Sequence, residues 1–91
     1  MMDRIKLLDA AKTAVLDREN SYGSPQANFD RAAKIWNVIL EGKLGDEHEI
    51  SGVDVGMMMC ALKLSRLIEN PGHPDSAVDL AGYAAILAEI A

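Results

Sequence analysis

The chain has 91 residues, of which 49% are hydrophobic, and it carries a formal net charge of −5. This length predicts one small domain over residues 1–91 with a modest core. The acidic balance argues against a nucleic-acid binder, because phosphates would be repelled. No apolar stretch reaches membrane length and no signal peptide is visible, so we expect a cytoplasmic protein without membrane contact. The single Cys60 fits a reducing compartment and is expected to be a buried small hydrophobe rather than a nucleophile.

Two helices are predicted in the first half of the chain. The first covers residues 3–18, where apolar residues recur at helical spacing and form a stripe of Ile5, Leu8, Val15 and Leu16. Residues 19–24 are expected to form a polar turn. Ser24 and Pro25 then supply a capping hydroxyl and a first-turn proline for the second helix. That helix is expected to end near Gly42 and Gly45.

Two more helices are predicted in the second half. The third begins at Ser51 with Asp54 as its capping-box partner, and it is apolar almost all round from residue 57 to 68, so we expect it to be the central buried helix. The fourth begins at residues 74–76, with Ser76 and Asp79 in the same box pattern. Because no run of residues alternates as a strand would, the predicted fold is an all-α bundle of about four helices.

The third helix also predicts self-association. A helix that is apolar all round needs cover on every side. Three short amphipathic partners within one chain provide too little of it. We therefore expect a homo-oligomer in which copies of the third and fourth helices complete the bundle.

Lys63 and Arg66 are the cations of the apolar third helix, and their spacing of three places them on one face. A buried charge requires a partner. The fork of Arg and the point charge of Lys suit a phosphate group, and His73 could donate to the same group near the start of the fourth helix. The alternative is an internal ion network in which both cations pair with Asp75 and Asp79.

Four other polar features complete the candidate site. Asp75 and Asp79 are four residues apart and could hold Mg²⁺, although Asp is also favoured in a first helical turn for its charge alone. Tyr22 could stack on a nucleobase or pack on the bundle. Asn28 could hydrogen-bond a base or sugar. Tyr83, one turn after Asp79, could complete the polar cluster or reach solvent.

Taken in order, these residues form a linked pattern. It comprises Arg18-Glu19-x-x-Tyr22-Gly23, Asn28-Phe29, Trp36, Asp54-Val55, Lys63-Leu64-x-Arg66 and His73-x-Asp75-Ser76-x-x-Asp79-x-x-Gly82-Tyr83. The pattern resembles a family of small phage and prophage proteins of unknown function, over about residues 14–91. The resemblance implies a phage-encoded protein that acts in the bacterial cytoplasm.

The Lys-x-x-Arg helix followed by an Asp-x-x-Gly-Tyr helix is also similar to the helical module of phage nucleotide kinases and to the all-α pyrophosphohydrolases of the MazG type. Those pyrophosphohydrolases are oligomeric bundles that hold Mg²⁺ with a Glu-x-x-Glu helix and a second acidic helix. Here the third helix lacks Glu-x-x-Glu and offers only Asp54. The resemblance implies a ligand that is a nucleotide or other phosphate metabolite, with Mg²⁺ as the candidate cofactor and turnover left open. The alternative is a non-enzymatic helical module that binds itself or a host protein.

Overall fold

The computed structural model of the protein describes residues 3–45 and 47–91, and within them the side chain of Tyr22 lies outside the described part. These residues form four helices and the turns between them. The helices are α1 (Arg4–Tyr22), α2 (Pro25–Leu44), α3 (Gly52–Glu69) and α4 (Pro74–Ile90). The described residues contain no strand, which confirms the all-α prediction. None of the described helices is both long and apolar enough to pass through a bilayer.

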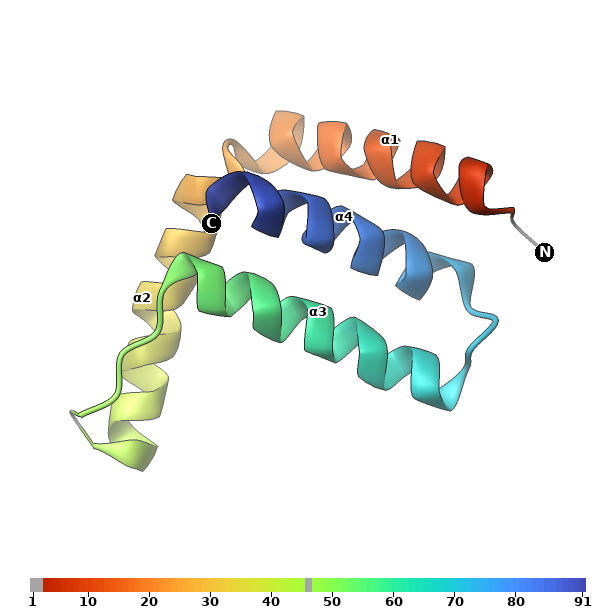
Figure 1. Cartoon of the computed structure of the whole chain (residues 1–91). Coiled ribbons are helices and arrows are strands. Elements are labelled where there is room, and N and C mark those ends of the chain that lie inside the picture. The colour runs from red at the N-terminus through yellow and green to blue at the C-terminus, as the bar shows by residue number, and fades with distance from the viewer. Residues whose placement is uncertain (1–2, 46) are drawn as a thin grey trace.

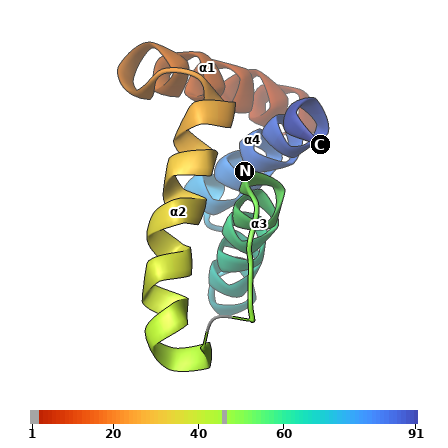
Figure 2. The ribbon, with the colours of Figure 1, turned by 90° about the vertical axis from the view of Figure 1, so that its left-hand side faces the viewer.

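The central helix is α4, which lies between α1 and α3, while α2 crosses the end of this layer (Figures 1 and 2). The prediction that the third helix would be central was therefore wrong. Small residues of α4 allow the close approach on one side, since a Cβ added to Gly82 would lie 3.5 Å from Val15 Cγ2. On the other side α3 approaches more closely, because a Cβ on Gly56 would lie 2.8 Å from Leu87 Cδ2.

The helix starts of α2 and α3 follow the sequence signals. The Ser24 hydroxyl accepts from the Ala27 N–H at 3.2 Å, and Pro25 is the first helical residue. In α3 the Asp54 N–H donates to Ser51 Oγ at 3.2 Å and the Ser51 N–H donates to Asp54 Oδ2 at 2.9 Å. Both predicted caps are thereby confirmed.

The end predicted for the first helix and the Ser76–Asp79 cap predicted for the fourth were wrong, whereas the fourth helix begins at Pro74 as predicted. The first helix continues one turn beyond Arg18 to residue 22 and ends at Gly23, whose φ of 83° suits glycine and whose N–H donates to the Glu19 carbonyl at 3.0 Å. The fourth helix is capped by His73, because the Ser76 N–H donates to His73 Nδ1 at 3.2 Å. Asp79 therefore lies beyond the first turn and is free of any capping role.

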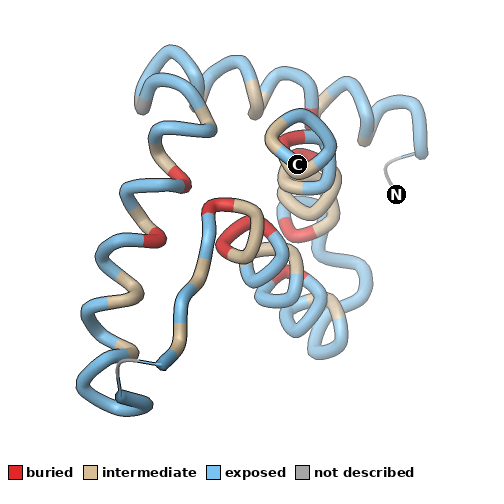
Figure 3. The backbone as a smooth tube through the Cα atoms, turned by 60° about the vertical axis from the view of Figure 1, so that its left-hand side comes forward, coloured by how far each residue is buried: buried red, intermediate tan, exposed pale blue. Residues whose placement is uncertain are grey.

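The buried core is small and lies where α2, α3 and α4 face one another (Figure 3). Its buried apolar members are Phe29, Ala33, Val55 and Ile86. The radius of gyration is 14.5 Å, against about 12 Å for a compact domain of this length. The chain therefore encloses less of its apolar surface than its length would allow.

Much apolar surface consequently remains open to solvent. The large hydrophobic residues exposed among the described ones include Ile5, Leu8, Leu16, Ile35, Val38, Ile39, Leu44, Met57, Met58, Leu62, Leu64 and Ile68. The predicted stripe of the first helix is largely part of this set, whereas Ala11 of the same helix is buried. The outer face of α3 is also exposed, so the expectation of a fully buried third helix was wrong for this single chain.

Candidate functional site

An ion cluster joins three helices in the middle of the molecule. Asp79 on α4 accepts from Arg18 on α1, with Nη2 and Oδ1 2.8 Å apart. Its other oxygen lies 3.1 Å from the Lys63 ammonium on α3. The Lys63 side chain is only 10% exposed and that of Asp79 22%. One carboxylate thus serves two cations, which leaves the cluster with a net charge of +1.

The Arg18 guanidinium also covers an aromatic ring. Its Cζ lies 4.9 Å from the centroid of the Tyr83 ring, within range of a cation–π contact. The Nη1 atom is buried and has no hydrogen-bond partner among the described residues. A guanidinium offers five donors, so Arg18 retains unused donor capacity after its bond to Asp79.

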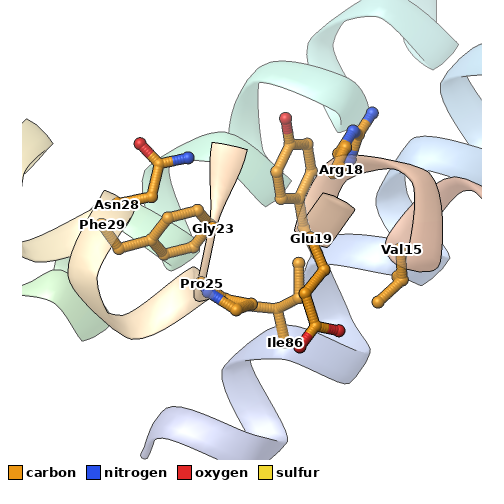
Figure 4. A pocket seen from close by; sticks show the side chains of 9 residues that line it. Val15, Arg18, Glu19, Gly23, Pro25, Asn28, Phe29 and Ile86 are labelled. Atoms are coloured by element: carbon orange, nitrogen blue, oxygen red, sulfur yellow. The ribbon is translucent and has the colours of Figure 1, made fainter. Parts of the chain in front are cut away.

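A cavity of about 280 Å³ lies beside this guanidinium, where α1, α2 and α4 meet (Figure 4). It is lined by Val15, Arg18, Glu19, Gly23, Pro25, Asn28, Phe29, Tyr83 and Ile86. The rings of Phe29 and Tyr83 lie with their centroids 6.2 Å apart and tilted by 40°. A concavity lined by apolar side chains and by a few converging polar groups is typical of a small-molecule site.

Four polar side chains line the cavity, namely Arg18, Glu19, Asn28 and Tyr83. Among the described lining residues, Arg18 is the one cation and Glu19 is the one anion. Figure 4 shows the guanidinium and the carboxylate turned in different directions, with the Asn28 amide at a third position. Within the described residues, the Asn28 amide forms no hydrogen bond to another side chain. The cavity thus offers a positive group, a negative group, the Tyr83 hydroxyl and an amide that has no side-chain partner among the described residues.

The structure brings only some of the predicted site residues to the cavity. Asn28 and Tyr83 line the cavity. Lys63 does not line it, but Lys63 pairs with Asp79, which also binds the lining residue Arg18. Arg66 is exposed near the end of α3 and lines no part of the cavity, so the expected shared burial of Lys63 and Arg66 was wrong. The Tyr22 side chain lies outside the described residues, and the predicted contact of this ring stays a prediction.

The residues at the start of α4 lie apart from the cavity as well. His73 Nδ1 lies 2.9 Å from the Ser76 hydroxyl and accepts from the Ser76 N–H, so this nitrogen serves the cap. Asp75 is exposed in the first turn, whereas Asp79 binds the two cations. The predicted alternative, an internal ion network, is found for Lys63 and Asp79. The second cation of this network is Arg18 and not Arg66. Within the described ranges, no three Asp, Glu, His or Cys side chains gather as metal ligands.

Arg18, Glu19 and Phe29 line the cavity, although the sequence analysis named them only as parts of the linked pattern. The available signal was the Arg18-Glu19 pair, which precedes Tyr22-Gly23 with two residues between. Cys60 lies away from the cavity, half-buried on α3, and burial raises the pKa of its thiol. A raised pKa lowers the thiolate fraction, which agrees with a packing role rather than a nucleophilic one.

Comparison with known proteins places this architecture in a family. Residues 6–91 match the family described as a domain of unknown function, DUF6378. The chain belongs to the DUF6378 family. The DUF6378 chain is 39% identical over 70 residues to the Gene 55 protein of Mycobacterium phage L5, an alignment that covers 77% of this chain and 42% of the relative. It is 35% identical over 74 residues to the Gene 55 protein of Mycobacterium phage D29, covering 81% and 45%.

These relatives support the predicted likeness to small phage proteins of unknown function. The chain spans less than half of the length of either relative. No solved structure matches the chain. The site geometry of this DUF6378 protein must therefore be interpreted from its own residues.

Proposed function

We propose that the protein binds a nucleotide or a related small phosphate-bearing molecule in the cavity between α1, α2 and α4. The observation that carries the proposal is the convergence there of the Arg18 guanidinium, the Asn28 amide and the Phe29–Tyr83 ring pair. A guanidinium binds phosphate through parallel hydrogen bonds. Aromatic faces accept a nucleobase by stacking, which is tolerant of base identity.

The charge of the ion cluster supports the same proposal. Lys63 and Arg18 share Asp79 as their carboxylate, so one positive charge lacks a counter-ion within the cluster. Desolvating an uncompensated charge is costly. An anionic ligand beside Arg18 would supply the missing negative charge, and Lys63 would act at a distance by keeping Asp79 engaged.

This arrangement changes the predicted division of roles. Arg18 is the residue proposed to bind the phosphate group, because Arg66 and His73 do not line the cavity. Asn28 keeps its predicted role toward base or sugar, and Tyr83, which was predicted to complete the polar cluster or reach solvent, lines the cavity beside Arg18. Mg²⁺ would enter with the phosphate groups and not through a site built by the protein alone, as is common for this ion.

The test is a thermal-shift panel of nucleoside mono-, di- and triphosphates and cyclic nucleotides, each with and without Mg²⁺. A ligand at about one hundred times its dissociation constant adds about 2.7 kcal/mol. That gain should raise Tm by roughly 10–20 °C in a domain of this size. The expected result is a selective shift that is lost in Arg18→Met, since methionine keeps much of the side-chain length without the donors.

Arg66→Met is the matched control, because it makes the same substitution at an exposed arginine outside the cavity. It should retain the ligand-induced shift. If Arg66→Met abolishes the shift while Arg18→Met retains it, the ligand lies elsewhere and the proposed site is wrong. No shift with any member of the panel would reject nucleotide binding itself.

Self-association is a second candidate function, favoured by the outer face of α3. Met57, Leu64 and Ile68 lie on one stripe of this helix and are 56%, 51% and 82% exposed. Exposed apolar patches of this kind mark interaction sites. The large radius of gyration also favours self-association. A second copy packed on this face of α3 would bury apolar side chains that a single chain leaves exposed.

Sedimentation equilibrium tests this second candidate. The wild-type chain is expected to associate, and Leu64→Lys should shift it toward monomer, because a charge at the centre of the stripe would be buried between copies. Asn20→Lys adds the same charge at an exposed residue of α1 and should leave association unchanged. A monomeric wild-type chain at about 100 μM would contradict self-association, since specific complexes commonly bind more tightly than this.

A further inference from the structure

Resting on the proposed function, we infer that the ligand is of the nucleoside monophosphate class, one ring system with a single acidic group, and that Glu19 selects against further phosphates. The inference follows from the balance of charges around the cavity and from its volume.

The four charges counted at and directly behind the cavity sum to zero. Arg18 and Lys63 contribute two positive charges, and Asp79 and Glu19 contribute two negative ones. Asp79 holds both cations, whereas Glu19 is exposed and forms no ion pair with a described cation within 4 Å. A bound group with one acidic function can pair with Arg18. Each additional phosphate would find no second lining cation and would approach the Glu19 carboxylate instead.

The volume of the cavity also favours a ligand with a single phosphate group. The cavity measures about 280 Å³, just below the range of about 300–1,000 Å³ that drug-sized ligands occupy. This space accepts one ring system beside the Phe29 and Tyr83 rings together with a short polar group. A triphosphate chain would have to extend past Glu19 into solvent, where it would gain little from the cavity.

Glu19 and Asn28 also determine which hydrogen-bonding groups the ligand must carry. An ionised carboxylate only accepts hydrogen bonds, and an amide both donates and accepts. Ring-bound amino or ring N–H groups satisfy both partners, as nucleobases do. The Glu19 backbone carbonyl caps α1 by accepting from Gly23, so the side chain can be altered without removing this bond.

The experiment is isothermal titration of the full chain with the mono-, di- and triphosphates of one nucleoside, and with the nucleoside alone. It is run without Mg²⁺, which would mask phosphate charge, at about 0.1 M ionic strength, where charges interact over about 10 Å. Wild-type protein is expected to bind the monophosphate at least about tenfold more tightly than the triphosphate. Glu19→Gln should reduce that ratio to about threefold or less, because it removes the like charge and keeps the size.

Glu41→Gln is the matched control, since it makes the same change of net charge at an exposed residue of α2 that does not line the cavity. It should leave the ratio unchanged. Tighter binding of the triphosphate by the wild-type protein, or an unchanged ratio in Glu19→Gln, would overturn this inference while leaving nucleotide binding intact. Absence of binding by every compound would instead overturn the proposed function and this inference together.

Discussion

Replacing Asp79 with alanine is expected to destabilise the protein by about 3 kcal/mol, the lower end of the range measured when one partner of a buried ion pair is removed. The reason is the position of Lys63, whose ammonium would lose its carboxylate while remaining almost fully enclosed. Arg18 would lose the same partner but is 31% exposed and can turn toward water. A domain of this size has about 5–15 kcal/mol of stability in total.

Urea unfolding followed by circular dichroism measures this loss as a lower midpoint at an unchanged slope. Asp75→Ala is the matched control on the same helix, because Asp75 is exposed and forms no ion pair with a described residue. Its loss should not exceed about 1 kcal/mol, the usual value of a carboxylate in a first helical turn. Equal losses in the two variants would show that the Asp79 cluster contributes no more than an ordinary surface charge.

A double variant separates the cost of an unpaired cation from the value of the pair. Lys63→Met combined with Asp79→Leu replaces the pair by apolar side chains of similar size, a change that is often neutral or stabilising. It should recover at least half of the stability lost in Asp79→Ala. Failure to recover would assign the loss to the Arg18–Asp79 contact, which the double variant also lacks.

Features encoded within a few residues could be predicted from the sequence. The caps at Ser24 and Ser51 belong to this class, because each cap and the N–H it accepts from lie three residues apart. The buried cation at Lys63 could also be anticipated, since a lone charge in an apolar helix demands a partner. One of the two carboxylates proposed for it, Asp79, is the one that it contacts.

Features that depend on how helices pack could not be predicted in the same way. Arg18 and Asp79 lie 61 residues apart in sequence, and no local spacing announces their contact. The packing of α3 against α4 includes a close approach at Gly56, whereas hydrophobicity alone favoured the third helix as the central one. The cavity arises only where the end of α1, the start of α2 and the middle of α4 converge, so its lining became apparent only in the folded chain.

Replacing Phe29 with alanine is expected to cost about 3–5 kcal/mol, the usual loss for an aromatic residue in a core. Phe29 is only 8% exposed, packs in the cluster with Val55 and Ile86, and stands beside the Tyr83 ring. The variant loses the transferred apolar surface and the ring–ring contact, and it leaves a void between α2 and its neighbours. Thermal unfolding should therefore show a fall in Tm of at least about 12 °C.

Val38→Ala is the matched control on the same helix, since Val38 is 70% exposed and its truncation should change stability by no more than about 0.5 kcal/mol. Phe29→Leu fills more of the void and should cost less than alanine. Phe29 also lines the cavity, so ligand-induced shifts should weaken in Phe29→Leu even where the fold survives. A Phe29→Ala variant as stable as Val38→Ala would mean that the small cluster around Phe29 is not the main source of stability, and that the open apolar faces, covered by a second copy, supply it instead.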